Sequence, residues 1–94
     1  VDNVVNANIL AISKKEPLSG ICLNVACGDR TSNNQILEHF QSKFDNIKIK
    51  QAPFRVGDVL HTHADTLLTK EVLGYVPTVR FWEGLDRTFS WWKI

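Results

Sequence analysis

Apolar positions at the start of the chain recur every three to four residues, as they do on one face of an α-helix. That face carries Val1, Val5, Ile9 and Ile12. Lys14 and Lys15 follow, where the negative end of the helix dipole favours cations, and Pro17 prevents continuation. The pattern therefore predicts an amphipathic helix from Val1 to about Lys14.

The middle of the chain alternates between strand and helix patterns. Residues 21–26 (ICLNVA) are a short apolar run between two glycines, typical of a buried strand. Ser32 and Gln35 have the spacing of a capping box, which predicts the start of a helix. Residues 47–51 alternate apolar and polar positions, which predicts a strand near a sheet edge. Together these segments predict a βαβ unit with parallel strands and a right-handed crossover.

The last third of the chain predicts two more helices. Asp65 is placed to cap a helix that runs through Leu73, and Gly74 suits a left-handed C-terminal position. A final helix is expected from about Phe81 to Trp92, with one apolar face and Trp91 or Trp92 partly exposed. The expected fold class is α/β, in the order helix, strand, helix, strand, helix, helix, without a Rossmann domain.

Length and charge restrict the classes of function. Ninety-four residues make one small domain at most. A net charge of +1 lacks the basic surface that nucleic acids or anionic membranes attract, and no apolar run is long enough to cross a bilayer. The chain contains no methionine, so Val1 is not expected to be a translation start. Two cysteines are too few for a disulfide framework and favour a reducing, cytoplasmic compartment.

The sharpest local signal is the run Arg55-Val56-Gly57-Asp58. An arginine fork can hold a diphosphate through two parallel hydrogen bonds. Gly57 permits a tight backbone turn near a ligand, and Asp58 can accept hydrogen bonds from ribose hydroxyls. The tetrapeptide by itself is better explained by a surface loop with a local Arg–Asp pair.

The surroundings of this run carry a resemblance to a known family. The order Pro-x-Arg-x-Gly-Asp, Ala-Asp, Leu-Gly-Tyr-x-Pro, Glu-Gly-Leu and an aromatic last helix resembles the C-terminal segment of extended short-chain dehydrogenases/reductases, the NAD-dependent epimerase/dehydratase family. These motifs include Pro53, Arg55, Gly57, Asp58, Ala64, Asp65, Leu73, Gly74, Tyr75, Pro77, Glu83, Gly84, Leu85 and Trp91. Residues 1–11 and 22–37 resemble upstream parts of the same family. The Gly28 to Ser32 turn is most similar to epimerases of UDP-N-acetylhexosamines.

The resemblance implies a binding role for four residues. Arg55 would contact the UDP diphosphate, and Asp58 would contact the ribose. Thr62 would face the sugar near its C2 substituent, and His61 matches a recurrent family position beside it. A small residue at position 62 leaves room for an acetamido group, although Thr62 is equally explained as an ordinary loop residue.

The resemblance also implies that substrate binding and cofactor binding belong to separate domains of a longer parent protein. Residues 1–94 would be a partial substrate-binding domain whose partners are a UDP-sugar and a missing cofactor domain. NAD would bind that missing domain, since the chain has no Gly-x-x-Gly-x-x-Gly turn. No catalytic residue is expected here, because Tyr75 is followed four residues later by Val79 rather than lysine. The parent is expected to be a homodimer, and the chain alone is expected to be inactive.

Other interpretations remain open. The His61-x-His63-x-Asp65 run could suggest a metal site, but such sites need further ligands that the chain does not offer nearby, and no metal is expected. Arg30 is a candidate ligand contact or an ordinary turn residue. The parent could instead be a nucleotide-sugar dehydratase or decarboxylase. The chain could also be a stand-alone binding module without enzymatic activity.

Overall fold

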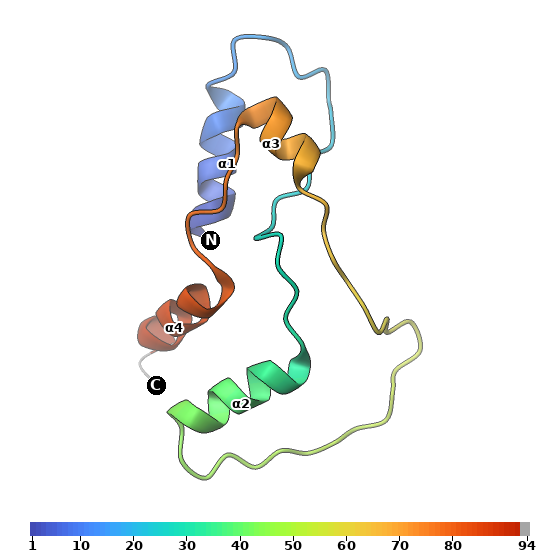
Figure 1. Cartoon of the computed structure of the whole chain (residues 1–94), viewed down its shortest axis with the longest axis vertical. Coiled ribbons are helices and arrows are strands. Elements are labelled where there is room, and N and C mark those ends of the chain that lie inside the picture. The colour runs from blue at the N-terminus through green and yellow to red at the C-terminus, as the bar shows by residue number, and fades with distance from the viewer. Residues whose placement is uncertain (93–94) are drawn as a thin grey trace. The chain divides into compact units, whose positions relative to one another are not determined.

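The computed structural model describes residues 1–92, which contain four helices (Figure 1). They are α1 (Asp2–Ile12), α2 (Asn33–Lys43), α3 (Leu67–Leu73) and α4 (Phe81–Trp92). Each lies where the sequence pattern predicts a helix. The chain divides into two compact units. We call residues 1–29 together with residues 63–92 the core unit, and residues 30–62 the middle unit.

The predicted α/β fold class is wrong. No β-strand occurs between residues 1 and 92, so there is no sheet and no parallel βαβ unit in this part of the chain. Residues 21–26 run without regular secondary structure, although Leu23 and Val25 pack against the core as the apolar pattern suggests. Residues 47–51 are also irregular, and Ile49 is half exposed. The apolar patterns exist, but no neighbouring strand pairs with them.

Side chains donate hydrogen bonds to backbone carbonyls of residues 21–26, which in a sheet would accept from a neighbouring strand. The Tyr75 hydroxyl donates to the carbonyl oxygen of Ala26 at 3.0 Å, and the Thr69 hydroxyl donates to the carbonyl of Asn24. Asn24 in turn donates through its side-chain amide to the carbonyl of Asp65 at 3.1 Å. Buried backbone groups need a hydrogen-bond partner of some kind. For the carbonyls of Asn24 and Ala26 these partners are Thr69 of α3 and Tyr75 just after it, rather than a neighbouring strand.

The core of the core unit lies between α1, α3 and the residues just after α3. Ala7, Leu73 and Tyr75 form its buried cluster, and α1 contacts α3 directly. The face of α1 that is buried therefore contains Ala7 and Leu10. The predicted apolar stripe of Val1, Val5, Ile9 and Ile12 is exposed instead. This corrects the sequence interpretation, because α1 packs against the core through Ala7, Leu10 and Ala11.

The ends of α3 are set by local chemistry. Gly74 adopts a φ of 68°, in the left-handed region, and its N–H donates to the Lys70 carbonyl at 2.8 Å. At the other end Thr66 is the N-cap rather than Asp65. The Asp65 carboxylate still accepts a hydrogen bond from the Leu67 N–H at 2.9 Å. The predicted stop is confirmed, and the predicted cap is displaced by one residue.

Helix α2 begins with the predicted capping box. The Ser32 hydroxyl accepts from the Gln35 N–H at 3.2 Å, and the Gln35 side chain accepts from the Ser32 N–H at 2.9 Å. None of the α2 residues is buried. Its capping box is joined by a local contact between Phe40 and Phe44, whose ring centroids are 6.0 Å apart.

Helix α4 is more strongly amphipathic than α1 or α2. Phe89 is buried on one side, and Leu85 is half-buried on the same face. Trp91 and Trp92 are both largely exposed, with their rings 6.1 Å apart in an edge-to-face arrangement. Among residues 1–92, no helix has both the length and the apolar character needed to cross a membrane.

Candidate functional site

The sequence-predicted pair of Arg55 and Asp58 forms one tight turn. The Asp58 N–H donates to the Arg55 carbonyl at 3.1 Å, which closes the turn. The Asp58 Oδ2 atom then accepts from the Arg55 backbone N–H at 3.3 Å and from its Nε–H at 3.4 Å. Gly57 makes this turn possible because its φ is 94°, a conformation that side chains with a Cβ rarely adopt.

This geometry leaves the two terminal amino groups of Arg55 available to a ligand. Asp58 engages Nε, and the structure gives neither terminal amino group of Arg55 a partner within residues 1–92. The side chain is 86% exposed. Two parallel N–H groups at the end of a guanidinium are the part that fits a phosphate or carboxylate. The second oxygen of Asp58 likewise has no partner in the described chain and can accept from a hydroxyl.

His61 is joined to Arg30, a residue 31 positions earlier in the chain. The Arg30 Nη2 lies 3.0 Å from the His61 Nδ1. Both residues belong to the middle unit, as do Arg55 and Asp58. These four residues thus lie in one unit and form two pairs, Arg30 with His61 and Arg55 with Asp58.

Thr62 is exposed, and the structure records no hydrogen bond from it to the other predicted site residues. Its role toward a sugar therefore stays a prediction. Sequence reasoning missed the contact of Arg30 with His61. Nothing in the local sequence signals a pair so far apart, whereas an Arg and an Asp three residues apart in a Gly-containing turn can be recognised directly.

The His61-x-His63-x-Asp65 run does not assemble into a metal centre. His63 Nε2 lies 2.8 Å from the Gly28 carbonyl, and the Asp65 carboxylate accepts a hydrogen bond from the Leu67 N–H. Between residues 1 and 92 no three His, Cys, Asp or Glu side chains come together in a way that could hold a metal ion. Each member of the run has a structural contact of its own.

The chain's own residues do not fit NAD either. A dinucleotide pyrophosphate is held by a glycine-rich turn that links a strand to a helix N-terminus. Here the start of α2 is already occupied by its Ser32 and Gln35 caps, and residues 1–92 contain no strand that could precede such a turn. No step of any reaction is therefore assigned to NAD within this chain.

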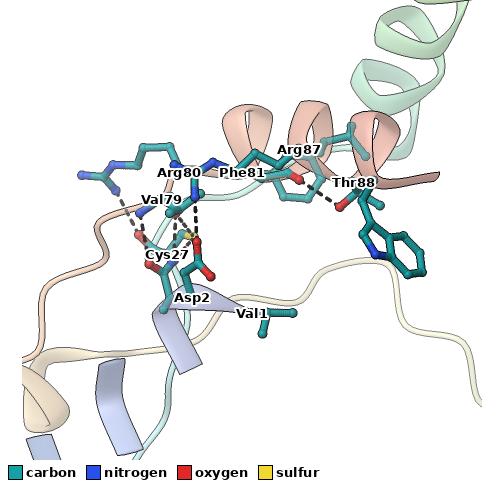
Figure 2. Close-up of a pocket in the computed structure, with 12 residues that line it drawn as sticks. Val1, Asp2, Cys27, Val79, Arg80, Phe81, Arg87 and Thr88 are labelled. Carbon is teal, nitrogen blue, oxygen red and sulfur yellow. Dashed lines mark hydrogen bonds and ion pairs between the residues drawn. The ribbon is translucent and has the colours of Figure 1, made fainter. Parts of the chain in front are cut away.

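The core unit contains a separate apolar pocket of about 720 Å³ beside α4 (Figure 2). Its walls come from the start of α1, residues near Cys27 and one side of α4. Apolar and aromatic side chains dominate, namely Val1, Val79, Phe81, Leu85 and Trp91.

The polar side chains around this pocket are engaged with one another. Arg80 donates to the Cys27 carbonyl at 3.1 Å and to Asp29 at 3.2 Å, and Arg87 donates to Asp2 at 2.7 Å. Both arginines that line the pocket are therefore paired with carboxylates, so the pocket has no arginine left for an anion. It differs in this respect from the middle unit, and we do not regard it as the site for an anionic ligand.

One asparagine fastens the N-terminal helix to the segment before α4. The Asn3 Oδ1 atom accepts from the backbone N–H groups of Thr78 and Val79, both at 3.0 Å. Its Nδ2 donates to the Val79 carbonyl at 2.8 Å. These contacts join positions about 75 residues apart. The Nδ2 atom also donates to the Cys27 Sγ at 3.5 Å. Because most of these bonds end on the backbone, we assign Asn3 a structural role.

Tyr75, within the described residues, has a perturbed pKa. Its side chain is buried, at 1% exposure, so loss of hydration raises the pKa of the phenol above its ordinary value, and the nearby Cys27 raises it further. The phenol therefore remains protonated and acts as a hydrogen-bond donor to Ala26. We assign Tyr75 to the core rather than to chemistry.

Comparison with known proteins gives a partial likeness. No family model matches the chain, and no solved structure matches it. A stretch of 57 residues, 61% of the chain, is 39% identical to an uncharacterized protein of Methanocaldococcus jannaschii. That stretch covers 17% of the archaeal protein, which is therefore about 335 residues long (57 divided by 0.17). The likeness is thus to one part of a much longer protein.

Proposed function

We propose that this chain supplies the nucleotide-anchoring part of a nucleotide-sugar epimerase that uses NAD elsewhere in a longer protein. Arg55 holds the diphosphate, Asp58 accepts from the ribose, and His61 and Thr62 lie toward the sugar. The small side chain of Thr62 favours a UDP-N-acetylhexosamine. The parent is a cytoplasmic homodimer in this proposal, in keeping with the two free thiols, Cys22 and Cys27.

The observation that carries the proposal is the orientation of Arg55. Asp58 binds the Nε side of the guanidinium and leaves its two terminal amino groups without a partner in the described residues. A diphosphate needs such a two-pronged donor. The same carboxylate fixes the arginine through two hydrogen bonds, so part of the ordering is already in place before a ligand binds.

Two further observations support the proposal. The order of motifs from Pro53 to Trp91 resembles one family along the whole segment. The archaeal relative is long enough to hold a cofactor domain in addition to a segment like this one. The α/β fold that the resemblance implied is absent, so the proposal rests on the Arg55 turn and the motif order, and not on the fold.

Anchoring of this kind has a clear mechanical purpose. An epimerase must let the sugar turn within the site, so firm contacts belong on the nucleotide and loose ones on the sugar. Binding free energy from the non-reacting nucleotide then positions the reacting part. Arg55 and Asp58 suit the firm contacts, while the exposed Thr62 makes no bond that would restrict a sugar.

Calorimetric titration of the chain with UDP tests this function. We expect Arg55→Ala to weaken UDP binding by about 1.5 kcal/mol, the lower end for a hydrogen bond to a charged group, because the site is exposed. Arg55→Lys should recover part of this loss, since an ammonium lacks the fork. Uridine, which has no phosphate, should bind the parent and Arg55→Ala equally.

Lys50→Ala is the matched control, because it removes one exposed positive charge from the same unit. It should change UDP affinity much less than Arg55→Ala does. Equal losses in the two variants would show that UDP senses only overall charge. In that case Arg55 has no specific role toward the diphosphate and the proposal is wrong.

A further inference from the structure

Arg30 differs from every other arginine in residues 1–92. Its guanidinium contacts a histidine, whereas each of the others lies against at least one carboxylate. The carboxylate pairs are Arg55 with Asp58, Arg80 with Asp29, and Arg87 with Asp2 and Glu83. The structure places no acidic side chain against Arg30 within the described residues. Its positive charge is therefore the least compensated of the four.

The contact between Arg30 and His61 determines where the protons lie. Arginine has only donors, so His61 must accept through Nδ1, at 3.0 Å. A neutral imidazole that accepts at Nδ1 carries its proton on Nε2. The pair therefore offers donors alone to its surroundings, namely the remaining N–H groups of the guanidinium and the Nε2–H of the ring.

We propose that Arg30 and His61 form a second anion contact of the nucleotide-sugar site. This inference rests on the proposed function, because the ligand is the same one that Arg55 holds. A group of donors with a net positive charge binds an anionic oxygen in preference to a neutral one. His61 directly precedes Thr62, the residue predicted to face the sugar, and all of these residues lie in the middle unit.

The ligand chemistry is an oxygen of a phosphate or of a sugar carboxylate. A carboxylate is planar and a phosphate is tetrahedral, and a guanidinium binds either group through paired hydrogen bonds. A phosphate contact would mean that Arg30 assists Arg55 on the diphosphate. A carboxylate contact would mean that the sugar is a uronic acid. Both forms share the same requirement, an anionic oxygen at the Arg30–His61 pair.

Calorimetry on the 94-residue chain separates these forms. The ligands are uridine, UDP, UDP-glucose and UDP-glucuronate, and the variants are Arg30→Gln, Arg30→Lys and the charge control Lys50→Gln. We expect Arg30→Gln to weaken an anionic ligand about five-fold or more, well beyond Lys50→Gln, with uridine unchanged. Equal losses for UDP and both sugar nucleotides identify a phosphate contact. A larger loss for UDP-glucuronate identifies a sugar carboxylate.

Imidazole nitrogen chemical shifts give a second readout that does not depend on affinity. In the unaltered chain His61 should show the Nε2–H tautomer, and Arg30→Gln should convert it to a mixture of tautomers. The inference is overturned if Arg30→Gln weakens no ligand more than Lys50→Gln does. If Arg55→Ala still weakens UDP in that case, the proposed function stands without Arg30. Absence of UDP binding to the unaltered chain would overturn both.

Discussion

The two units of the chain differ in what holds them together. The core unit contains all the buried residues of the described chain: Ala7, Thr69, Leu73, Tyr75 and Phe89. In the middle unit no residue is buried, and its recorded contacts include a helix cap, a tight turn and one Arg–His pair. Besides local contacts, the core unit has hydrogen bonds that join residues from 24 to 85 positions apart. The comparison indicates that stability lies in one unit and candidate ligand chemistry in the other.

This separation has a physical basis. Groups that bind a ligand must remain accessible and keep some hydrogen-bonding capacity free. They therefore cannot also be the groups that pack and form hydrogen bonds in the core. Arg55 is 86% exposed, and its carboxylate partner engages only Nε. In the core unit, by contrast, carboxylates engage the terminal amino groups of Arg80 and Arg87. A bound ligand would accordingly restrict the motion of the middle unit more than that of the core unit.

The largest effect should come from removing the centre of the core unit. Tyr75→Ala deletes a buried ring and its hydrogen bond to the Ala26 carbonyl. Large-to-small changes of this kind cost about 3–5 kcal/mol of unfolding free energy. Urea unfolding followed by tryptophan fluorescence measures the loss. Phe54→Ala is the control in the middle unit, since Phe54 is largely exposed, and it should change stability by less than about 0.5 kcal/mol.

Similar losses for Tyr75→Ala and Phe54→Ala would remove the contrast between the units. They would mean that Phe54 is buried in solution and that the middle unit has a core of its own.

A smaller effect is expected at the start of α2. Ser32→Ala removes the hydroxyl that accepts from the Gln35 N–H and should destabilise α2 by about 1 kcal/mol. Because α2 buries no residue, amide hydrogen exchange should quicken throughout α2 while α1 and α3 keep their protection. Ser42→Ala is the control within the same helix. Its hydroxyl donates to the nearby His39 carbonyl and has no capping role. Loss of protection in α1 as well would show that the two units unfold together.

The smallest effect is a pH dependence of the core unit. Burial raises the pKa of Tyr75, so the folded state holds this proton more tightly than the unfolded state does. Its contribution to stability is therefore complete below pH of about 10 and is lost as pH rises through the raised folded value. Since Tyr75 is the chain's one tyrosine, phenolate absorbance reports it directly. The unfolding free energy should fall more steeply above pH of about 10 in the parent than in Tyr75→Phe, and identical slopes would contradict the burial of this phenol.

Local features of the fold could be predicted from the sequence. The capping box of Ser32 and Gln35, the left-handed Gly74 and the limits of α4 all depend on residues within one or two turns of each other. The pairing of Arg55 with Asp58 belongs to the same class, since both lie in one turn. These interactions need no knowledge of the rest of the chain.

Features that depend on distant partners could not be predicted. An apolar run such as residues 21–26 becomes a strand only if a neighbouring strand pairs with its backbone. Here the side chains of Thr69 and Tyr75 donate hydrogen bonds to its carbonyls instead. The choice of the buried face of α1 depends on where α3 packs. The contact of Arg30 with His61 spans 31 positions and has no local signature.

The most direct test of the account is a nuclear magnetic resonance titration of the isotopically labelled chain with UDP. We predict saturable shifts that are largest for the backbone amides from Arg55 to Thr62, with the core unit unchanged. Shifts that cluster between Val79 and Trp91 would place the ligand in the apolar pocket instead. Either that result or an absence of saturable shifts would contradict the assignment of nucleotide binding to the middle unit.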